Sequence, residues 1–373
     1  MIDQKVHTLL TDSRMILVCG PGGVGKTTTA AALGVLAAQT TDKRVLVLTV
    51  DPARRLATAL GLQALGNAEV PVLIEGSRGS LTMAMIDTKA SWDDMIRRHA
   101  PDVATRDKVL ANELYRTLTS RFVHSHDYVV TERLFEARES GKYDLVIVDT
   151  PPSRSALSVL DAPRRMQQFF SSRLLKLLTA PAQSRVLSLA SRPFFIVADR
   201  ILGARFLADI AEFFTLFRTM EQPVVDRARR VGELLAHSET RYLVVSSAEP
   251  VALREADYLV RELRRRSHQL AVVLLNRLIP MRLATGAAQR AERLAMSSDT
   301  SVPALAQAEQ AMAAAALQEA AQVAVVMSWG ADVLYCETQE GDITDIAALA
   351  HLGISISSTP RTYDGAVTDK NGD

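Results

Sequence analysis

Four glycines, a lysine and two threonines lie close together in the stretch GPGGVGKTT, from Gly20 to Thr28. The stretch satisfies the pattern G-x-x-x-x-G-K-[ST], in which a glycine-rich backbone turns its N–H groups around phosphate oxygens. In this pattern the lysine adds a positive charge at the phosphates, and the hydroxyl after it is a ligand for Mg²⁺. The chemistry indicated is binding and hydrolysis of a nucleoside triphosphate.

We therefore predict a phosphate-binding loop in which Lys26 is the catalytic cation and Thr27 is a Mg²⁺ ligand. The predicted nucleotide-binding residues of this loop are Gly22, Gly23, Val24, Gly25, Lys26, Thr27 and Thr28. An apolar run precedes the loop and an alanine-rich run follows it, as the motif requires. A glycine-rich turn without a ligand is the disfavoured alternative.

Two aspartates at the ends of apolar runs are the candidate carboxylates. Asp149 ends the run YDLVIVD, which has the form of a Walker B segment that holds the Mg²⁺ shell. An isolated aspartate in such a place is more often a helix cap or turn residue, but the phosphate motif favours the metal role. Asp51 follows the run Arg44 to Val50 and is the predicted catalytic residue that orients the attacking water. Its other possible role is to start a turn before Pro52, and the residues alone leave both roles open.

The elements that would position these residues are strands and helices in alternation. Apolar, β-branched runs typical of buried parallel strands occur at Arg14–Cys19, Arg44–Val50, Ser80–Ile86, Tyr143–Val148, Arg241–Ser246, Leu270–Leu275 and Ala331–Tyr335. Helical stretches separate most of them, beginning with Thr27 to Gln39. The sequence predicts an α/β fold with a doubly wound, mostly parallel sheet of about seven strands.

Two helical segments, at about 88–140 and 155–237, are too long to be simple crossovers and are predicted insertions at the ligand edge of the sheet. We expect one ATPase domain over residues 1–356. The polar segment 357–373, which contains Pro and Gly, is a predicted disordered tail.

Composition narrows the range of partners. The 43 Lys+Arg and 42 Asp+Glu residues leave a net charge of +1, so no overall field favours nucleic acid. With only two cysteines, Cys19 and Cys336, the chain has neither a disulfide framework nor a CxxC metal site. The first residues contain no apolar stretch typical of a signal peptide, and no run reaches about 18 apolar residues. We expect a cytoplasmic protein, with peripheral attachment to a membrane left open.

Five motifs together resemble the ArsA-type ATPases, which include the arsenite-efflux ATPase subunit and the factor that delivers tail-anchored membrane proteins. They are GGVGKTTTAAALG, TVDPARRLA, YDLVIVDTPPS, SSAEPVALREA and VVLLNRLIP, in the family's order and spacing. The resemblance implies ATP and Mg²⁺ as cofactors, a catalytic carboxylate at Asp51 in a first switch, and a second switch from Asp149. It also implies a nucleotide or subunit contact at Glu249, adenine recognition by the amide of Asn276, and a dimer that closes around ATP.

The chain departs from that family at three places. Pro21 stands where the family usually has a lysine that reaches the partner's phosphates, and Ser153, Arg154 and Ser155 replace Thr-Gly-His in the second switch. The family's cysteine sites are missing, which disfavours an arsenite-efflux motor. Because Pro21 carries no charge, we expect a heterodimer with a paralogous ATPase subunit that keeps the lysine. The alternatives are a homo-oligomer that turns over slowly, and an arginine that replaces the lysine: Arg54, Arg55 or Arg154.

The second insertion is rich in phenylalanine. Eight of the 10 phenylalanines lie between Phe169 and Phe217, and an apolar face repeats at helical spacing through Phe206, Ile210, Phe213, Phe214 and Phe217. This face forms either a private helical core or a groove for an apolar client or a membrane-associated partner. The leading hypothesis is an ATPase that couples dimer closure to client handling, and the alternative is a regulatory or partition-type switch without cargo.

Overall fold

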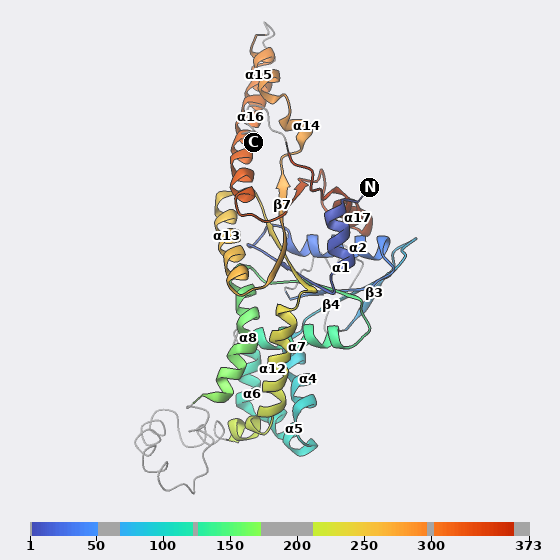
Figure 1. Ribbon diagram of the computed structural model, residues 1–373, viewed down its shortest axis with the longest axis vertical. Coiled ribbons are helices and arrows are strands. Elements are labelled where there is room, and N and C mark those ends of the chain that lie inside the picture. The colour runs from blue at the N-terminus through green and yellow to red at the C-terminus, as the bar shows by residue number, and fades with distance from the viewer. Residues whose placement is uncertain (1, 51–67, 122–125, 173–211, 297–301, 362–373) are drawn as a thin grey trace, which may run out of the picture.

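The computed structural model describes residues 2–50, 68–121, 126–172, 212–296 and 302–361. Its centre is an eight-stranded sheet with the order β3-β4-β2-β5-β1-β6-β7-β8 (Figure 1). The strands are β1 (Met15–Cys19), β2 (Arg44–Thr49), β3 (Val70–Val72), β4 (Ser80–Met85), β5 (Leu145–Asp149), β6 (Thr240–Ser246), β7 (Gln269–Leu278) and β8 (Val333–Glu337). All neighbours pair in parallel except β3 with β4.

The predicted α/β fold and its seven parallel strands are confirmed, and one further strand was missed. The missed strand, β3, is three residues long and contains Pro71, so it lacks the apolar run that marks the other strands. Proline is tolerated there because β3 lies at the edge of the sheet. Every residue of β1 and β5 is buried, as expected for central parallel strands covered on both faces.

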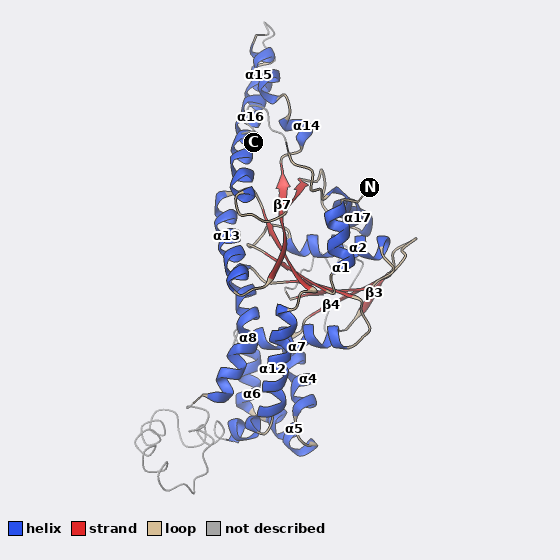
Figure 2. Ribbon diagram, viewed as in Figure 1, coloured by secondary structure: helices blue, strands red, loops and turns tan. Residues whose placement is uncertain are grey.

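Helices cover both faces of the sheet (Figure 2). Helices α1 (Gln4–Asp12), α2 (Lys26–Thr40) and α17 (Ile346–Ser355) pack on one face, where the alanine-rich side of α2 lies against the strands. The other face is covered by α13 (Pro250–Arg265), by α8 (Ser153–Ser171) and by the ends of α7 (His126–Glu139), α12 (Glu221–Ala236) and α16 (Pro303–Met327). Helices α14 (Met281–Ala284) and α15 (Ala287–Ala295) connect β7 to α16.

The two predicted insertions form one helical layer beside the sheet, drawn below it in Figure 1. It contains α4 (Thr88–His99), α5 (Val103–Ala111) and α6 (Glu113–Arg121) together with α7, α8 and α12. Phe170, Phe213 and Phe217 are at most 5% exposed and belong to its apolar core. The rings of Phe170 and Phe217 stack with centroids 5.3 Å apart. Phe206 and Ile210 lie outside the described residues, so the predicted face is placed only in part.

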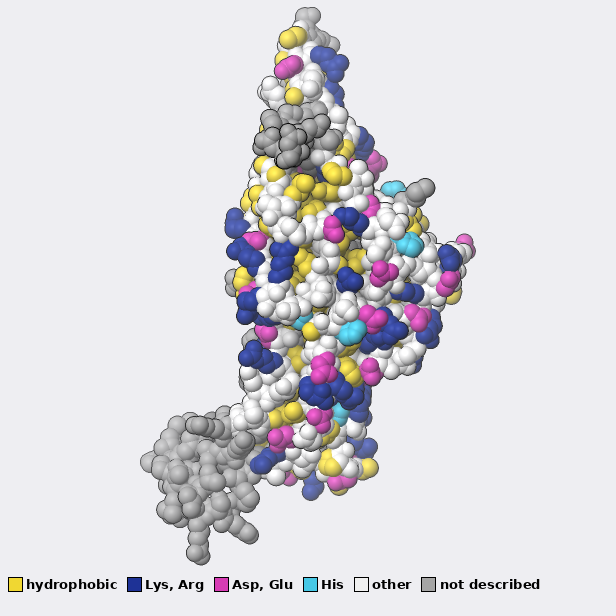
Figure 3. Space-filling model, in the orientation of Figure 1, with side chains coloured by type: hydrophobic (Ala, Val, Ile, Leu, Met, Phe, Trp, Pro, Cys, Tyr) yellow, Lys and Arg dark blue, Asp and Glu magenta, His cyan; other side chains and the backbone are white. Residues whose placement is uncertain are grey.

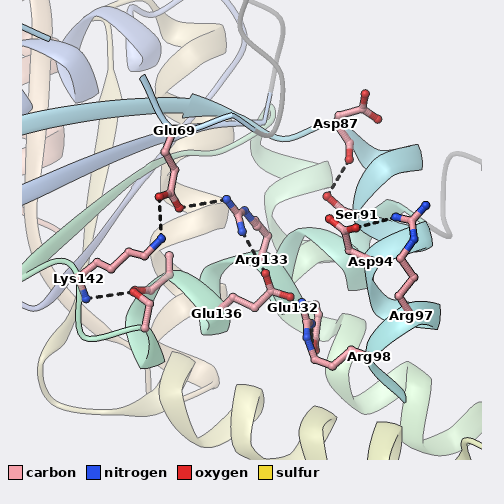
Figure 4. A network of polar contacts seen from close by, with 12 residues as sticks. Glu69, Asp87, Ser91, Asp94, Arg97, Arg98, Glu132, Arg133, Glu136 and Lys142 are labelled. Carbon is pink, nitrogen blue, oxygen red and sulfur yellow. Dashed lines mark hydrogen bonds and ion pairs between the residues drawn. The ribbon is translucent and has the colours of Figure 1, made fainter. Parts of the chain in front are cut away.

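A buried carboxylate ties the helices of this layer together. Glu132 on α7 is 2% exposed and accepts hydrogen bonds from Arg227 on α12 at 2.9 Å and from Arg98 on α4 at 3.2 Å. Burial raises the pKa of Glu132, but the neighbouring His99 and the charges of Arg227 and Arg98 outweigh this, so its pKa lies below the usual value. The ion pairs continue from Arg133 to Glu69, which precedes β3 (Figure 4).

Residues 357–361, the first part of the predicted tail, contact the edge of the sheet. Ser357 pairs with Tyr335 of β8, and the side chain of Arg361 is 5% exposed, with its guanidinium 3.1 Å from the Glu337 carboxylate. These contacts hold residues 357–361 against the sheet edge. Residues 362–373 lie outside the described residues.

Basic and acidic side chains are interspersed over the face shown in Figure 3, in keeping with the small net charge. None of the described helices is both long enough and apolar enough to cross a membrane.

We predict that Glu132→Gln destabilises the helical layer by about 3 kcal/mol, because Arg227 and Arg98 would keep their charges without the carboxylate. The matched control is Glu233→Gln, which breaks an exposed pair with Arg229 and should cost less than about 1 kcal/mol. Urea unfolding curves of both variants measure the difference.

The destabilisation should depend on pH. A carboxylate whose pKa is lowered by folding stabilises the native state fully above the usual glutamate pKa of 4.5, and loses this contribution as the pH falls through its folded value. The unfolding curves of Glu132→Gln and of the unchanged protein should therefore approach each other as the pH falls below 4.5. An equal gap at pH 7 and at pH 3 would contradict the role assigned to the charge.

Candidate nucleotide-binding site

The loop from Gly20 to Gly25 joins β1 to α2 in a path that requires glycine. Gly20 has φ +149°, and a Cβ there would lie 2.0 Å from the carbonyl oxygen of Val245 on β6. Gly25 has φ +95°, and a Cβ there would lie 2.4 Å from Nδ2 of Asn276. Any side chain at either position would push the loop away from the neighbouring strands. The glycines therefore hold the loop against the sheet edge.

Lys26 and the start of α2 form the phosphate-binding part of the loop. Lys26 is 8% exposed, and its Nζ donates to the carbonyl oxygen of Pro21 at 2.7 Å, which holds the charge over the loop. Helix α2 begins at Lys26 without a side-chain cap, so its first N–H groups suit an anion. Gly22 and Gly23 are exposed, Val24 is buried, and Thr28 is half-buried in the first turn of α2. These groups fit a triphosphate.

The predicted metal ligands come together. Oγ1 of Thr27 donates to Oδ2 of Asp149 at 2.6 Å, although 122 residues separate them in the chain. Asp149 is 1% exposed, and Oγ1 of Thr49 donates to the same oxygen at 2.9 Å. A hydroxyl and a carboxylate in contact fit Mg²⁺, which prefers oxygen ligands. The sequence reasoning missed Thr49, whose signal is a polar residue at the end of the apolar run RVLVLT.

Asn276 contacts the loop from the opposite side. It is 8% exposed, its Nδ2 donates to the carbonyl oxygen of Val24 at 2.8 Å, and its Oδ1 accepts from the N–H of Arg277 at 2.9 Å. The amide therefore fixes β7 to the phosphate loop. Recognition of adenine by this side chain stays a prediction.

The other predicted site residues are placed in part. Glu249 is exposed and directly precedes α13, on the connection that leaves the end of β6 beside β1. Its side chain does not cap α13, so a contact with a nucleotide or a second subunit stays a prediction. Asp51, Arg54 and Arg55 lie outside the described residues, as does the side chain of Arg154. The roles predicted for them remain predictions.

The two cysteines are far apart in the sheet, on β1 and on β8, and both are buried. Burial raises the pKa of the Cys19 thiol to about 11 and also raises the pKa of Cys336. Both thiols are therefore protonated at neutral pH, and thiolates are the form that binds soft metals and metalloids. Within the described ranges, no group of three His, Cys, Asp or Glu residues is arranged to hold a metal ion.

The family model of the anion-transporting ATPases, the ArsA type, matches residues 13–299 of the chain. This protein belongs to that family. The resemblance drawn from the five motifs is thereby confirmed, and so is ATPase activity. The chain is similar to the ATPase ASNA1 homolog 2 of Paramecium tetraurelia, with 24% identity over 272 residues that cover 71% of this chain and 76% of the relative. It is also similar to the ATPase get3 of Aspergillus terreus, with 26% identity over 71% of this chain and 73% of the relative.

The predicted metal site of this ArsA-type ATPase can be tested at Thr49. We predict that Thr49→Val keeps the fold but raises the Mg²⁺ concentration for half-maximal ATP hydrolysis by about tenfold, because the Thr49 hydroxyl donates to the Asp149 carboxylate and orients it. Titrating Mg²⁺ at saturating ATP measures this shift.

The control for this prediction is Thr131→Val. Thr131 is fully buried on α7, and its hydroxyl donates to the carbonyl oxygen of Tyr128 at 2.7 Å, away from Asp149. The Thr131→Val variant should have the same Mg²⁺ requirement as the unchanged protein. If the two variants shift the requirement equally, Thr49 has no particular role at the metal.

Proposed function

We propose that this chain is a Mg²⁺-dependent ATPase of the ArsA type that couples ATP binding and hydrolysis to the handling of an apolar client. The observation that carries the proposal is the hydrogen bond from Thr27 to Asp149, which brings the phosphate loop onto the strand that leads into the helical layer. Only residues 150–152 separate Asp149 from the start of α8 at Ser153.

Each site residue has a role in this chemistry. Lys26, which donates to the carbonyl oxygen of Pro21, would turn to the β- and γ-phosphates, and Thr27 and Asp149, which contact each other, would hold Mg²⁺. Bound there, Mg²⁺ would neutralise the charge that develops on the phosphate oxygens. Asp51 accepts a hydrogen bond from the attacking water and orients it toward the γ-phosphate. A shift of Asp149 between nucleotide states would move the start of α8.

The far end of α8 lies at an apolar cavity, which supports the client-binding part of the proposal. The cavity is about 300 Å³ and is lined by Trp92, Tyr115, Thr119, Tyr128, Ala162, Arg165, Met166, Phe169, Phe213, Phe214 and Phe217. Phe169 is near the end of α8, so the helix spans the distance from the metal ligand to the cavity. An apolar helix or chain segment is the class of client that such a lining would bind.

We predict that an apolar helical peptide binds with an affinity that differs at least fivefold between the ATP-analogue and ADP states. Phe214→Ser should weaken peptide binding by about tenfold, because it removes a large apolar contact that is only partly buried in the core. Basal ATP hydrolysis should be unchanged. Fluorescence anisotropy of a labelled peptide measures the affinity in each nucleotide state and the effect of Phe214→Ser on it.

Two controls separate the client hypothesis from a regulatory or partition-type switch. Leu73→Ser removes a side chain that is 90% exposed on the loop after β3 and should leave peptide binding unchanged. Lys26→Ala should abolish the difference between nucleotide states. Peptide binding that is absent, or identical in all nucleotide states, would favour the switch without cargo.

The assembly belongs to the same proposal. Two subunits close around ATP, and the second is a paralogue with lysine at the position of Pro21. Pro21 is buried, and its carbonyl oxygen accepts a hydrogen bond from Lys26. Because proline has no charge, this subunit supplies no cation to its partner from position 21. A positive group supplied across a subunit boundary can accelerate phosphoryl transfer by about 10³-fold or more.

We therefore expect the chain purified alone to hydrolyse ATP slowly, and the complex isolated from its native source to contain the paralogue and to be at least about 100-fold faster. Mass spectrometry of the native complex and steady-state rates test this. A homodimer as active as any native complex would exclude the heterodimer.

A further inference from the structure

Arg277 adopts an unusual backbone conformation beside the phosphate loop. Its φ is +60°, in the left-handed region that residues with a side chain rarely enter. The other described residue of this kind is Ser267 (φ +58°), in the turn that precedes β7. Backbone outliers of this type are retained where the surrounding structure determines them, and they are frequent at binding sites.

The contacts around Arg277 determine this conformation. Its N–H donates to Oδ1 of Asn276 at 2.9 Å, and Nδ2 of the same amide donates to the carbonyl oxygen of Val24 at 2.8 Å. The next residue, Leu278, is fully buried, and the pairing of β7 with β8 shifts register between Leu275 and Leu278. Buried anchors on both sides therefore turn the side chain of Arg277 outward.

The guanidinium of Arg277 makes no polar contact that stabilises the described part of the fold. Arg277 is exposed, and its side chain makes neither an ion pair nor a hydrogen bond with any described residue. Its neighbour Arg282 pairs with Glu340, and Arg361 pairs with Glu337. Arg277 thus differs from these two arginines in having no carboxylate partner among the residues that the structure describes.

The order of the strands shows which part of a nucleotide this cation can reach. Asp149 lies on β5, on one side of β1, whereas Arg277 lies on β7, on the other side and beyond β6. A nucleotide with its phosphates at Lys26 and its metal between Thr27 and Asp149 must extend its nucleoside away from β5. Arg277 is therefore on the nucleoside side, remote from the γ-phosphate.

We propose that Arg277 is a positioning residue for the nucleoside, whose guanidinium lies on the face of the purine ring of ATP or ADP. The amide of Asn276 contacts both the loop and the backbone N–H of Arg277, so the backbone from which the guanidinium extends is fixed before the nucleotide arrives. A guanidinium stacks on an aromatic face through its charge and its planar group. This inference rests on the proposed function, because it needs the phosphates to bind at Lys26.

The test is Arg277→Gly, which removes the guanidinium and also suits a φ of +60°. The variant should therefore be at least as stable to heat as the unchanged protein. We expect its Kd for ATP and for ADP to rise about 3- to 30-fold, and its Kd for inorganic tripolyphosphate to stay the same. Arg277→Lys keeps the charge but not the planar group, and should give an intermediate loss. Isothermal titration calorimetry with Mg²⁺ measures all three ligands.

Ser267→Gly is the matched control, because it relieves the same kind of backbone conformation at the opposite end of β7 and should leave all three affinities unchanged.

If Arg277→Gly weakens the binding of ATP and of tripolyphosphate equally, Arg277 contacts phosphate and the proposal is wrong. If Arg277→Gly leaves ATP binding unchanged, the proposal is also wrong. If the unchanged protein binds tripolyphosphate and ATP equally well, the nucleoside makes no contact and the inference fails while the phosphate site stands. If the unchanged protein binds neither, the proposed function itself fails.

Discussion

The hydrogen bond between Thr27 and Asp149 is the interaction on which the rest of the site depends. A carboxylate that is 1% exposed would be costly to bury without partners, and hydroxyls from two other elements supply them. The parallel register makes this possible, because Asp149 lies beside Val18 on β1 and beside Thr49 on β2. The phosphate loop, the metal ligand and the strand that leads to α8 therefore form one unit at the sheet edge.

The loop is held from its other side by Asn276 through the carbonyl oxygen of Val24. The nucleotide site thus lies at the switch point of the sheet, where β1 has β5 on one side and β6 on the other. On the β5 side are the groups suited to metal and γ-phosphate chemistry. On the β7 side are an amide and an outward-facing guanidinium, which suit a nucleoside. Strand order places these two sets of groups on opposite sides of β1.

The helical layer depends on a different constraint, the burial of Glu132 among Arg227, Arg98 and His99. A buried ion pair adds little net stability over an apolar substitute, but loss of one partner is strongly destabilising. Such a network favours one arrangement of α4, α7 and α12.

The sequence by itself determined the parts that rest on local patterns. The apolar runs predicted seven of the eight strands, and the spacing from Gly20 to Thr28 located the phosphate loop, because a motif of this kind is continuous in the chain. Tertiary structure alone decided which distant residues meet. Thr49 reaches Asp149 through strand pairing, Asn276 reaches Val24 across the sheet edge, and Glu132 gathers arginines from two other helices. No local pattern encodes these contacts, because each depends on the order and register of elements far apart in the chain.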